Sequence, residues 1–88
     1  MIELTYSQLL TFVTLVRERS MGATARTLQV SQPTVSLRIQ ALEQWLGKTL
    51  LDSKSRKTLT QDGRDFYPVA KEIVEKLQTA KVPAAQAK

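Results

Sequence analysis

Apolar residues recur at helical spacing in two stretches near the amino terminus. The first stretch predicts a helix over residues 6–19, with apolar positions at i, i+3, i+4 and i+7, which are Leu9, Phe12, Val13 and Val16. Thr5 and Gln8 have the spacing of a capping box, so this helix should begin directly after Thr5. The second stretch predicts a short helix over residues 21–28, with Met21, Ala25 and Leu28 on one face.

A third helix is predicted over residues 32–46 by an apolar repeat made up of Val35, Ile39, Leu42 and Leu46. Ser31 is a favourable N-cap residue, and Pro33 fits the first turn, where a missing N–H costs nothing. Gly47 stands where a left-handed C-cap residue belongs. Within this helix, Glu43 is expected to anchor a local hydrogen bond or ion pair.

Between residues 48 and 60 the pattern changes. A short apolar run, Leu50-Leu51, is followed by a polar stretch that ends with Lys57, and Thr58-Leu59-Thr60 then returns to strand-forming residues. We expect two short strands joined by a basic turn.

The last helix is predicted to start at Gln61, after a Thr60 cap, and to carry a heptad-like seam of Phe66, Ala70, Ile73, Leu77 and Ala80. This seam has two interpretations. It could pair with the same seam of a second copy, or it could fold onto the first helix of its own chain. Both can hold, because Val69 and Val74 supply a second apolar edge.

Composition narrows the function. The 88 residues, 42% hydrophobic and 24% charged, suit one small globular domain. The chain has no histidine and no cysteine, and its acidic residues form no paired arrangement. An enzyme is therefore not expected, and neither is a metal or a cofactor. No apolar run approaches the roughly 20 residues needed to cross a bilayer, and no signal peptide is visible, so we expect a cytoplasmic protein without a membrane partner.

The net charge is +5, and most of the excess lies between residues 48 and 64, which contain five basic residues and two acidic ones. A basic patch on a small domain favours a polyanion partner, with nucleic acid first. Mildly basic domains without such a partner are also common.

The helices at 21–28 and 32–46, joined by a short turn, have the layout of a helix–turn–helix, in which the start of the second helix enters the major groove. The polar residues there, including Gln32, Thr34 and Arg38, could contact base edges. A plain helical hairpin with a polar surface fits the same pattern. Likewise, the basic turn with Lys54, Arg56 and Lys57 could follow the phosphate backbone or be a solvated turn.

The chain resembles, in order and spacing, the amino-terminal domain of LysR-type transcriptional regulators over residues 4–80. The residues that carry the resemblance are Phe12, Ser20, Ala25, Leu28, Ser31-Gln32-Pro33-x-Val35-Ser36, Ile39, Leu42-Glu43, Leu46-Gly47, Leu50-Leu51, Leu59-Thr60 and Gly63. The resemblance implies a mostly α-helical fold. This fold is a winged helix–turn–helix with a three-helix core and a two-stranded wing, followed by a long linker helix for dimerisation.

The resemblance also assigns sites. Base-reading and phosphate-contacting positions fall on Ser31, Gln32, Pro33, Thr34, Ser36 and Arg38, with the wing residues Lys54, Arg56 and Lys57 on the DNA backbone. Dimerisation is expected through Phe66, Ala70, Ile73 and Leu77. Three departures stand out: Thr24 replaces a usual Ala, Leu37 occupies a commonly polar or basic position, and Ser53 lies where an Arg is frequent.

The expected organisation is a DNA-binding domain over residues 1–60, a linker helix over 61–82, and a tail or hinge over 83–88. The implied partners are a partly palindromic promoter in double-stranded DNA and a second copy of the chain, with a tetramer in the full-length protein. A small-molecule inducer would act only through a carboxyl-terminal domain that this chain lacks. The main rival is a winged-helix module that docks on protein.

Overall fold

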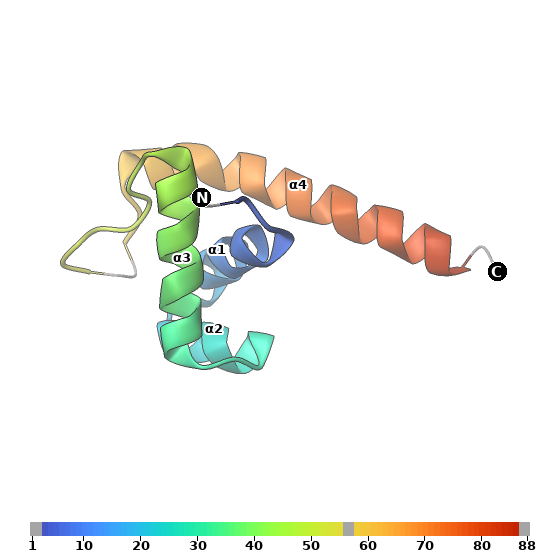
Figure 1. The fold of residues 1–88 in the computed structure, drawn as a ribbon, viewed down its shortest axis with the longest axis horizontal. Helices are drawn as coiled ribbons and strands as arrows, with labels where there is room; N and C mark the ends of the chain where they lie inside the picture. Colours follow the sequence, from blue (N-terminus) through green and yellow to red (C-terminus); the bar gives the residue numbers. More distant parts are fainter. Residues whose placement is uncertain (1–2, 56–57, 87–88) are drawn as a thin grey trace.

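Four helices make up the regular structure of the computed structural model, which describes residues 3–55 and 58–86, with side chains through residue 80. In chain order they are α1 (Tyr6–Glu18), α2 (Met21–Leu28), α3 (Gln32–Leu46) and α4 (Gln61–Gln86). Figure 1 shows α1, α2 and α3 gathered at one end of the molecule, while α4 extends away from them as a long arm. The mostly helical fold is thus confirmed, and none of the described helices is long and apolar enough to cross a membrane.

The helix starts follow the predicted caps. Thr5 and Gln8 form a complete capping box, with both backbone-to-side-chain bonds at 3.2 Å. The hydroxyl of Ser20 accepts the N–H of Ala23 and opens α2. α1 ends one residue earlier than expected, because Arg19 takes a left-handed conformation with φ of 62°. Local capping features therefore mark three of the helix boundaries.

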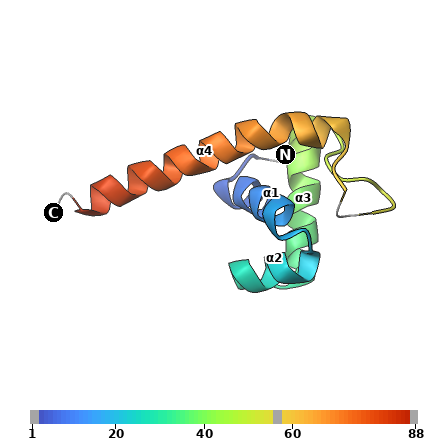
Figure 2. The same ribbon diagram turned by 180° about the vertical axis from the view of Figure 1, so that it is seen from behind.

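The hydrophobic core is built around α1, which contacts each of the other three helices. Phe12, fully buried, lies at its centre. The Phe12 ring packs against Phe66 and Tyr67 of α4, with centroid separations of 5.9 and 6.3 Å. From α3, Ile39 and Leu42 close the other side of the core. Figure 2 shows α1 lying among α2, α3 and the first turns of α4.

The segment between α3 and α4, residues 48–60, is called the wing loop below. The predicted pair of strands is wrong in this segment: the described residues form no strand, only one antiparallel bridge between Leu51 and Leu59. Two hydrogen bonds flank the bridge, from Asp52 N to Thr58 O at 2.8 Å and from Thr60 N to the Leu50 carbonyl at 3.0 Å. The loop projects from the helical end of the molecule, on the side opposite the arm (Figure 1).

Competing hydrogen bonds explain why the ladder stops there. The amides of Leu50 and Leu51 both donate to the carboxylate of Glu43, at 2.8 and 3.3 Å. Beyond the bridge, the carboxylate of Asp52 accepts the amides of Lys54 and Ser55, which turns the chain at once. The amide of Leu50, which would otherwise donate to Thr60 across the bridge, is thus bound by a side chain, and the ladder does not continue.

Candidate nucleic-acid interface

α2 and α3 are joined by a tight turn with a left-handed residue. Gln29 has φ of 60°, and the N–H of Val30 returns to the carbonyl of Ala25 at 2.9 Å, which closes the end of α2. Thr24 is fully buried in α2, and its hydroxyl donates to the carbonyl of Ser20 at 2.7 Å. The hydroxyl that departs from the family pattern is therefore satisfied inside its own helix. The two helices have the connectivity of a helix–turn–helix.

The start of α3 is a polar, exposed tip. Ser31, Gln32 and Pro33 are exposed, and Thr34 is half-buried. The Ser31 hydroxyl caps the helix by accepting the N–H of Thr34 at 3.2 Å, and it also lies 2.9 Å from the Thr34 hydroxyl. Of these four side chains, those of Gln32 and Pro33 lie outside this capping contact. Gln32 lies beside Gly22 at the start of α2.

Ser36 and Arg38, the other predicted contact residues of α3, are half-buried. Gln40 Nε2 approaches the Ser36 hydroxyl at 3.4 Å, one turn further along the helix. Arg38 turns toward α1, where its Nη1 lies 3.4 Å from the hydroxyl oxygen of Thr11. Thr11 is fully buried and donates its own proton to the Ser7 carbonyl at 2.6 Å. Arg38 is thus partly engaged within the fold rather than wholly presented to solvent.

The wing loop is bound to α3 near the carboxyl-terminal end of the helix. Glu43 makes two hydrogen bonds to the start of the loop. The loop is thus attached to the same helix whose amino-terminal end forms the polar tip. Lys54 is exposed in the middle of the loop. Arg56 and Lys57, predicted beside it, lie outside the described residues.

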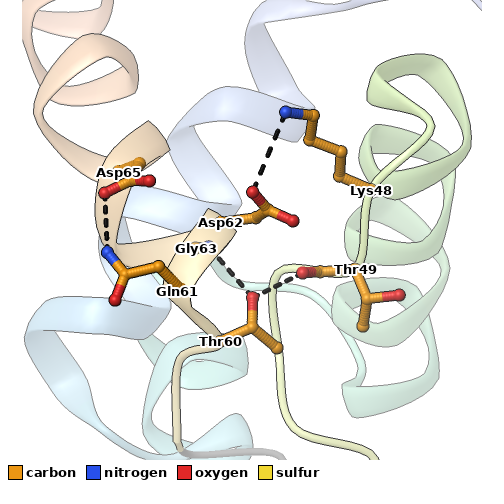
Figure 3. A network of polar contacts seen from close by, with 7 residues as sticks. All are labelled: Lys48, Thr49, Thr60, Gln61, Asp62, Gly63 and Asp65. Carbon is orange, nitrogen blue, oxygen red and sulfur yellow. Dashed lines mark hydrogen bonds and ion pairs between the residues drawn. The ribbon is translucent and has the colours of Figure 1, made fainter.

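A polar network fixes the other end of the wing loop to α4 (Figure 3). The hydroxyl of Thr60 accepts the N–H of Gly63 at 3.0 Å, as predicted for a cap, and donates to the carbonyl of Thr49. Lys48 and Asp62 form an ion pair across the same junction, with 3.8 Å between nitrogen and oxygen. The loop therefore leaves and returns at two anchored points.

The four predicted dimerisation residues fall into two groups. Phe66 packs on Phe12 of its own chain, and Ala70 is fully buried. Ile73 and Leu77, by contrast, are 36% and 47% exposed on the arm, and Val69 adds a third exposed apolar side chain at the same four-residue spacing. The first half of the seam thus packs in the core, and the second half faces solvent.

Comparisons with known proteins agree with this architecture. The family model described as "Bacterial regulatory helix-turn-helix protein, lysR family" matches residues 6–64. A probable RuBisCO transcriptional regulator of Cyanidioschyzon merolae is 44% identical over 71 residues, which are 80% of this chain and 23% of that protein.

Solved structures show the same fold. A full-length OxyR variant from Pseudomonas aeruginosa superposes with a TM-score of 0.91 at 33% identity, over 98% of this chain and 30% of that one. The crystal structure of the BenM_DBD/catB site 1 DNA complex gives a TM-score of 0.85 at 30% identity, over 96% of this chain and 91% of that one. The chain spans less than a third of the length of the curated relatives that it matches. On the family match and these similarities together, the chain belongs to the lysR family of bacterial regulatory helix–turn–helix proteins.

Proposed function

We propose that this chain is the DNA-binding domain of a transcriptional regulator and binds double-stranded promoter DNA in a sequence-specific way. The observation that carries the proposal is the exposed polar tip of α3 on a helix–turn–helix, in a chain whose net charge is +5. The BenM_DBD complex, a solved relative of the same fold, contains DNA and supports it. The relatives that the chain matches are named as transcriptional regulators, which favours this function over an enzymatic one.

In this proposal the tip of α3 enters the major groove, which is wide enough for a helix. Gln32 is the best-placed polar reader, because its exposed amide can accept from and donate to adenine at once. Ser31, Pro33, Thr34 and Ser36 line the tip around it. Arg38 is proposed to reach a guanine by leaving its contact with Thr11.

The role of Arg38 is tested by Arg38→Ala on cognate and scrambled duplexes. We expect a loss of about 1–3 kcal/mol on the cognate duplex only, with relaxed base preference. Equal losses on both duplexes would make Arg38 a phosphate contact instead.

The wing loop is proposed to lie on the DNA backbone through Lys54, Arg56 and Lys57. If Lys54 neutralises a phosphate, Lys54→Ala should weaken binding to all duplexes similarly and reduce the salt dependence of log K by about 0.9. Lys76→Ala is the matched control, since it removes the same charge from the arm, where Lys76 pairs with Glu72. An equal slope for the Lys54 variant and the original chain would remove Lys54 from the interface.

The arm is proposed to pair two copies of the chain, so that the dimer reads two half-sites of a partly palindromic promoter. Ile73 and Leu77 would bury their exposed surface there, while Phe66 and Ala70 hold the arm to the core. Leu77→Glu should raise the dimer dissociation constant at least tenfold by sedimentation, because it places a charge in an apolar seam. Gln78→Glu, an exposed neighbour with the same added charge, should leave it nearly unchanged. Equal constants for both variants would contradict pairing through this face.

The proposed organisation is a DNA-binding unit at residues 1–60 and a linker helix that begins at residue 61. α4 continues beyond the expected end of this helix at residue 82 and runs to Gln86. A separate effector domain in the rest of the regulator would bind a small inducer and assemble dimers into tetramers. Because its proposed target is promoter DNA, the protein would act in the bacterial cytoplasm.

The rival proposal, a protein-docking module, is weaker because the tip of α3 exposes Gln32 and Pro33 rather than aromatic anchors. Retention of the purified chain on bulk duplex DNA separates the two. A DNA-binding domain should be retained at low salt and released as salt rises. Absence of retention at low salt would contradict the proposed function.

A further inference from the structure

Leu37 occupies an unusual place on α3 for an apolar side chain. It follows the fully buried Val35 by two residues, which is about 200° around a helix that turns about 100° per residue. Its side chain therefore points directly away from the core, and it is 63% exposed, the largest exposed fraction among the large apolar residues described. Core packing does not explain a leucine here.

The neighbours of Leu37 place it among the residues at the polar tip. Pro33, four residues before it, and Gln40, three residues after it, are exposed on the same face. Arg38, the adjacent residue, instead turns to the side and contacts Thr11 of α1. On the second turn of α3, the most exposed side chain is thus the apolar Leu37, while the charged Arg38 turns toward α1.

We propose that Leu37 is a specificity-determining residue that packs against the 5-methyl group of a thymine in the major groove. This inference rests on the proposed function, since it requires α3 to enter that groove. Thymine is the only base that presents a methyl group there, so an apolar side chain at the front of the helix can favour it. A leucine offers no hydrogen bond to any base edge, and it leaves the polar groups of a guanine or cytosine at that position unpaired.

The first experiment compares selections from a random-sequence duplex library by the purified chain and by Leu37→Gln. The original chain should enrich a motif with thymine at one position of each half-site. Leu37→Gln should lose that thymine and favour adenine there, because a glutamine amide matches the adenine edge. The rest of the motif should stay the same.

Trp45→Gln is the matched control. Trp45 is 49% exposed and lies at the opposite end of α3, two turns from Leu37, so its replacement removes exposed apolar surface from the same helix without touching the tip. Its selected motif should equal that of the original chain. Thermal unfolding of both variants confirms that each is folded during selection.

The second experiment replaces the selected thymine by deoxyuridine, which removes only the methyl group. The original chain should lose about fourfold in affinity, the value of one buried methyl group. Leu37→Ala should bind the thymine and deoxyuridine duplexes equally.

The outcomes separate the two proposals. If the original chain enriches a motif but Leu37→Gln keeps the same thymine, or if deoxyuridine changes nothing, the role of Leu37 is refuted and DNA binding stands. If the original chain enriches no motif and shows no salt-dependent retention on duplex DNA, the proposed function itself fails.

Discussion

Gly63 in the first turn of α4 offers a sharp test of how the wing loop is held. A β-carbon added at this position would lie well inside contact distance of the Leu50 carbonyl oxygen, 3.1 Å from the carbonyl carbon and 3.2 Å from Cδ2 of Leu59. Its nearest neighbours are backbone atoms, which cannot rotate away. The same carbonyl accepts the N–H of Thr60, so displacing it would also strain the junction between loop and helix.

The size of the effect follows from two opposing contributions. Alanine is a better helix former than glycine by roughly 0.5–1 kcal/mol, which would stabilise an unobstructed position. Forcing a methyl group into a filled site costs about 1–3 kcal/mol or more, because close-packed surroundings must shift. The cost should lie at the upper end of this range because the nearest atoms belong to the backbone. After the helical gain is subtracted, we expect Gly63→Ala to lower the free energy of unfolding by about 2 kcal/mol.

Gly22 supplies a matched control, since it lies in the first turn of α2. A β-carbon there would meet only side-chain atoms, the nearest being Nε2 of Gln32 at 3.4 Å. Gly22→Ala should therefore leave stability unchanged or raise it by up to about 1 kcal/mol. Urea unfolding followed by far-ultraviolet circular dichroism measures both variants. If Gly63→Ala were as stable as Gly22→Ala, the close approach of Leu50 to α4 would be refuted.

Three further changes test other features by the same unfolding assay. Glu43→Ala should lower the free energy of unfolding by about 2–3 kcal/mol, because it leaves two wing-loop amides without their carboxylate partner. A smaller loss in Glu43→Gln would agree with a retained acceptor. Thr14→Val should be neutral or stabilising by up to about 1 kcal/mol, since the buried Thr14 hydroxyl has no hydrogen-bond partner among the described residues. Thr11→Val should destabilise, because the Thr11 hydroxyl donates to the Ser7 carbonyl. The reverse order would contradict these hydrogen-bond assignments. Gln29→Gly should raise the free energy of unfolding by up to about 1 kcal/mol, because glycine adopts the left-handed conformation without strain. A measured loss would show that the Gln29 side chain stabilises the fold by more than its backbone strain costs.

The helix boundaries could be predicted because their signals are local. Ser31 caps its helix by a bond to a residue three positions away, and Gly47 ends the helix in a left-handed conformation, with φ of 69°. Thr60 caps α4 in the same local way. Each of these interactions depends on a few consecutive residues, so the sequence pattern is sufficient to predict them.

Two outcomes could not be predicted from the sequence: that the two expected strands do not form in the described residues, and that Arg38 turns toward α1. Both depend on partners outside the local pattern. Glu43 is expected to anchor a local hydrogen bond, but the strand-like pattern does not reveal that it binds the amides of Leu50 and Leu51, seven and eight residues later. Arg38 is half-buried because it meets Thr11, which lies 27 positions away on another helix. Helical periodicity gives a residue's direction on its own helix but not what it meets there. The exposure of Leu37 could be inferred from its phase relative to Val35, although the sequence pattern drew attention to its polar neighbours first.

The attachment of the wing loop to Glu43 has a geometric consequence for how a regulator of this kind could evolve. Because α3 carries the proposed groove-reading tip at its amino-terminal end and binds the wing loop through Glu43 near its carboxyl-terminal end, the separation between these two proposed DNA contacts would be fixed within each subunit. The distance between subunits would instead depend on the length and pairing of the arm. Changes in α4 would then alter the spacing of half-sites while the sequence read within each one stays the same.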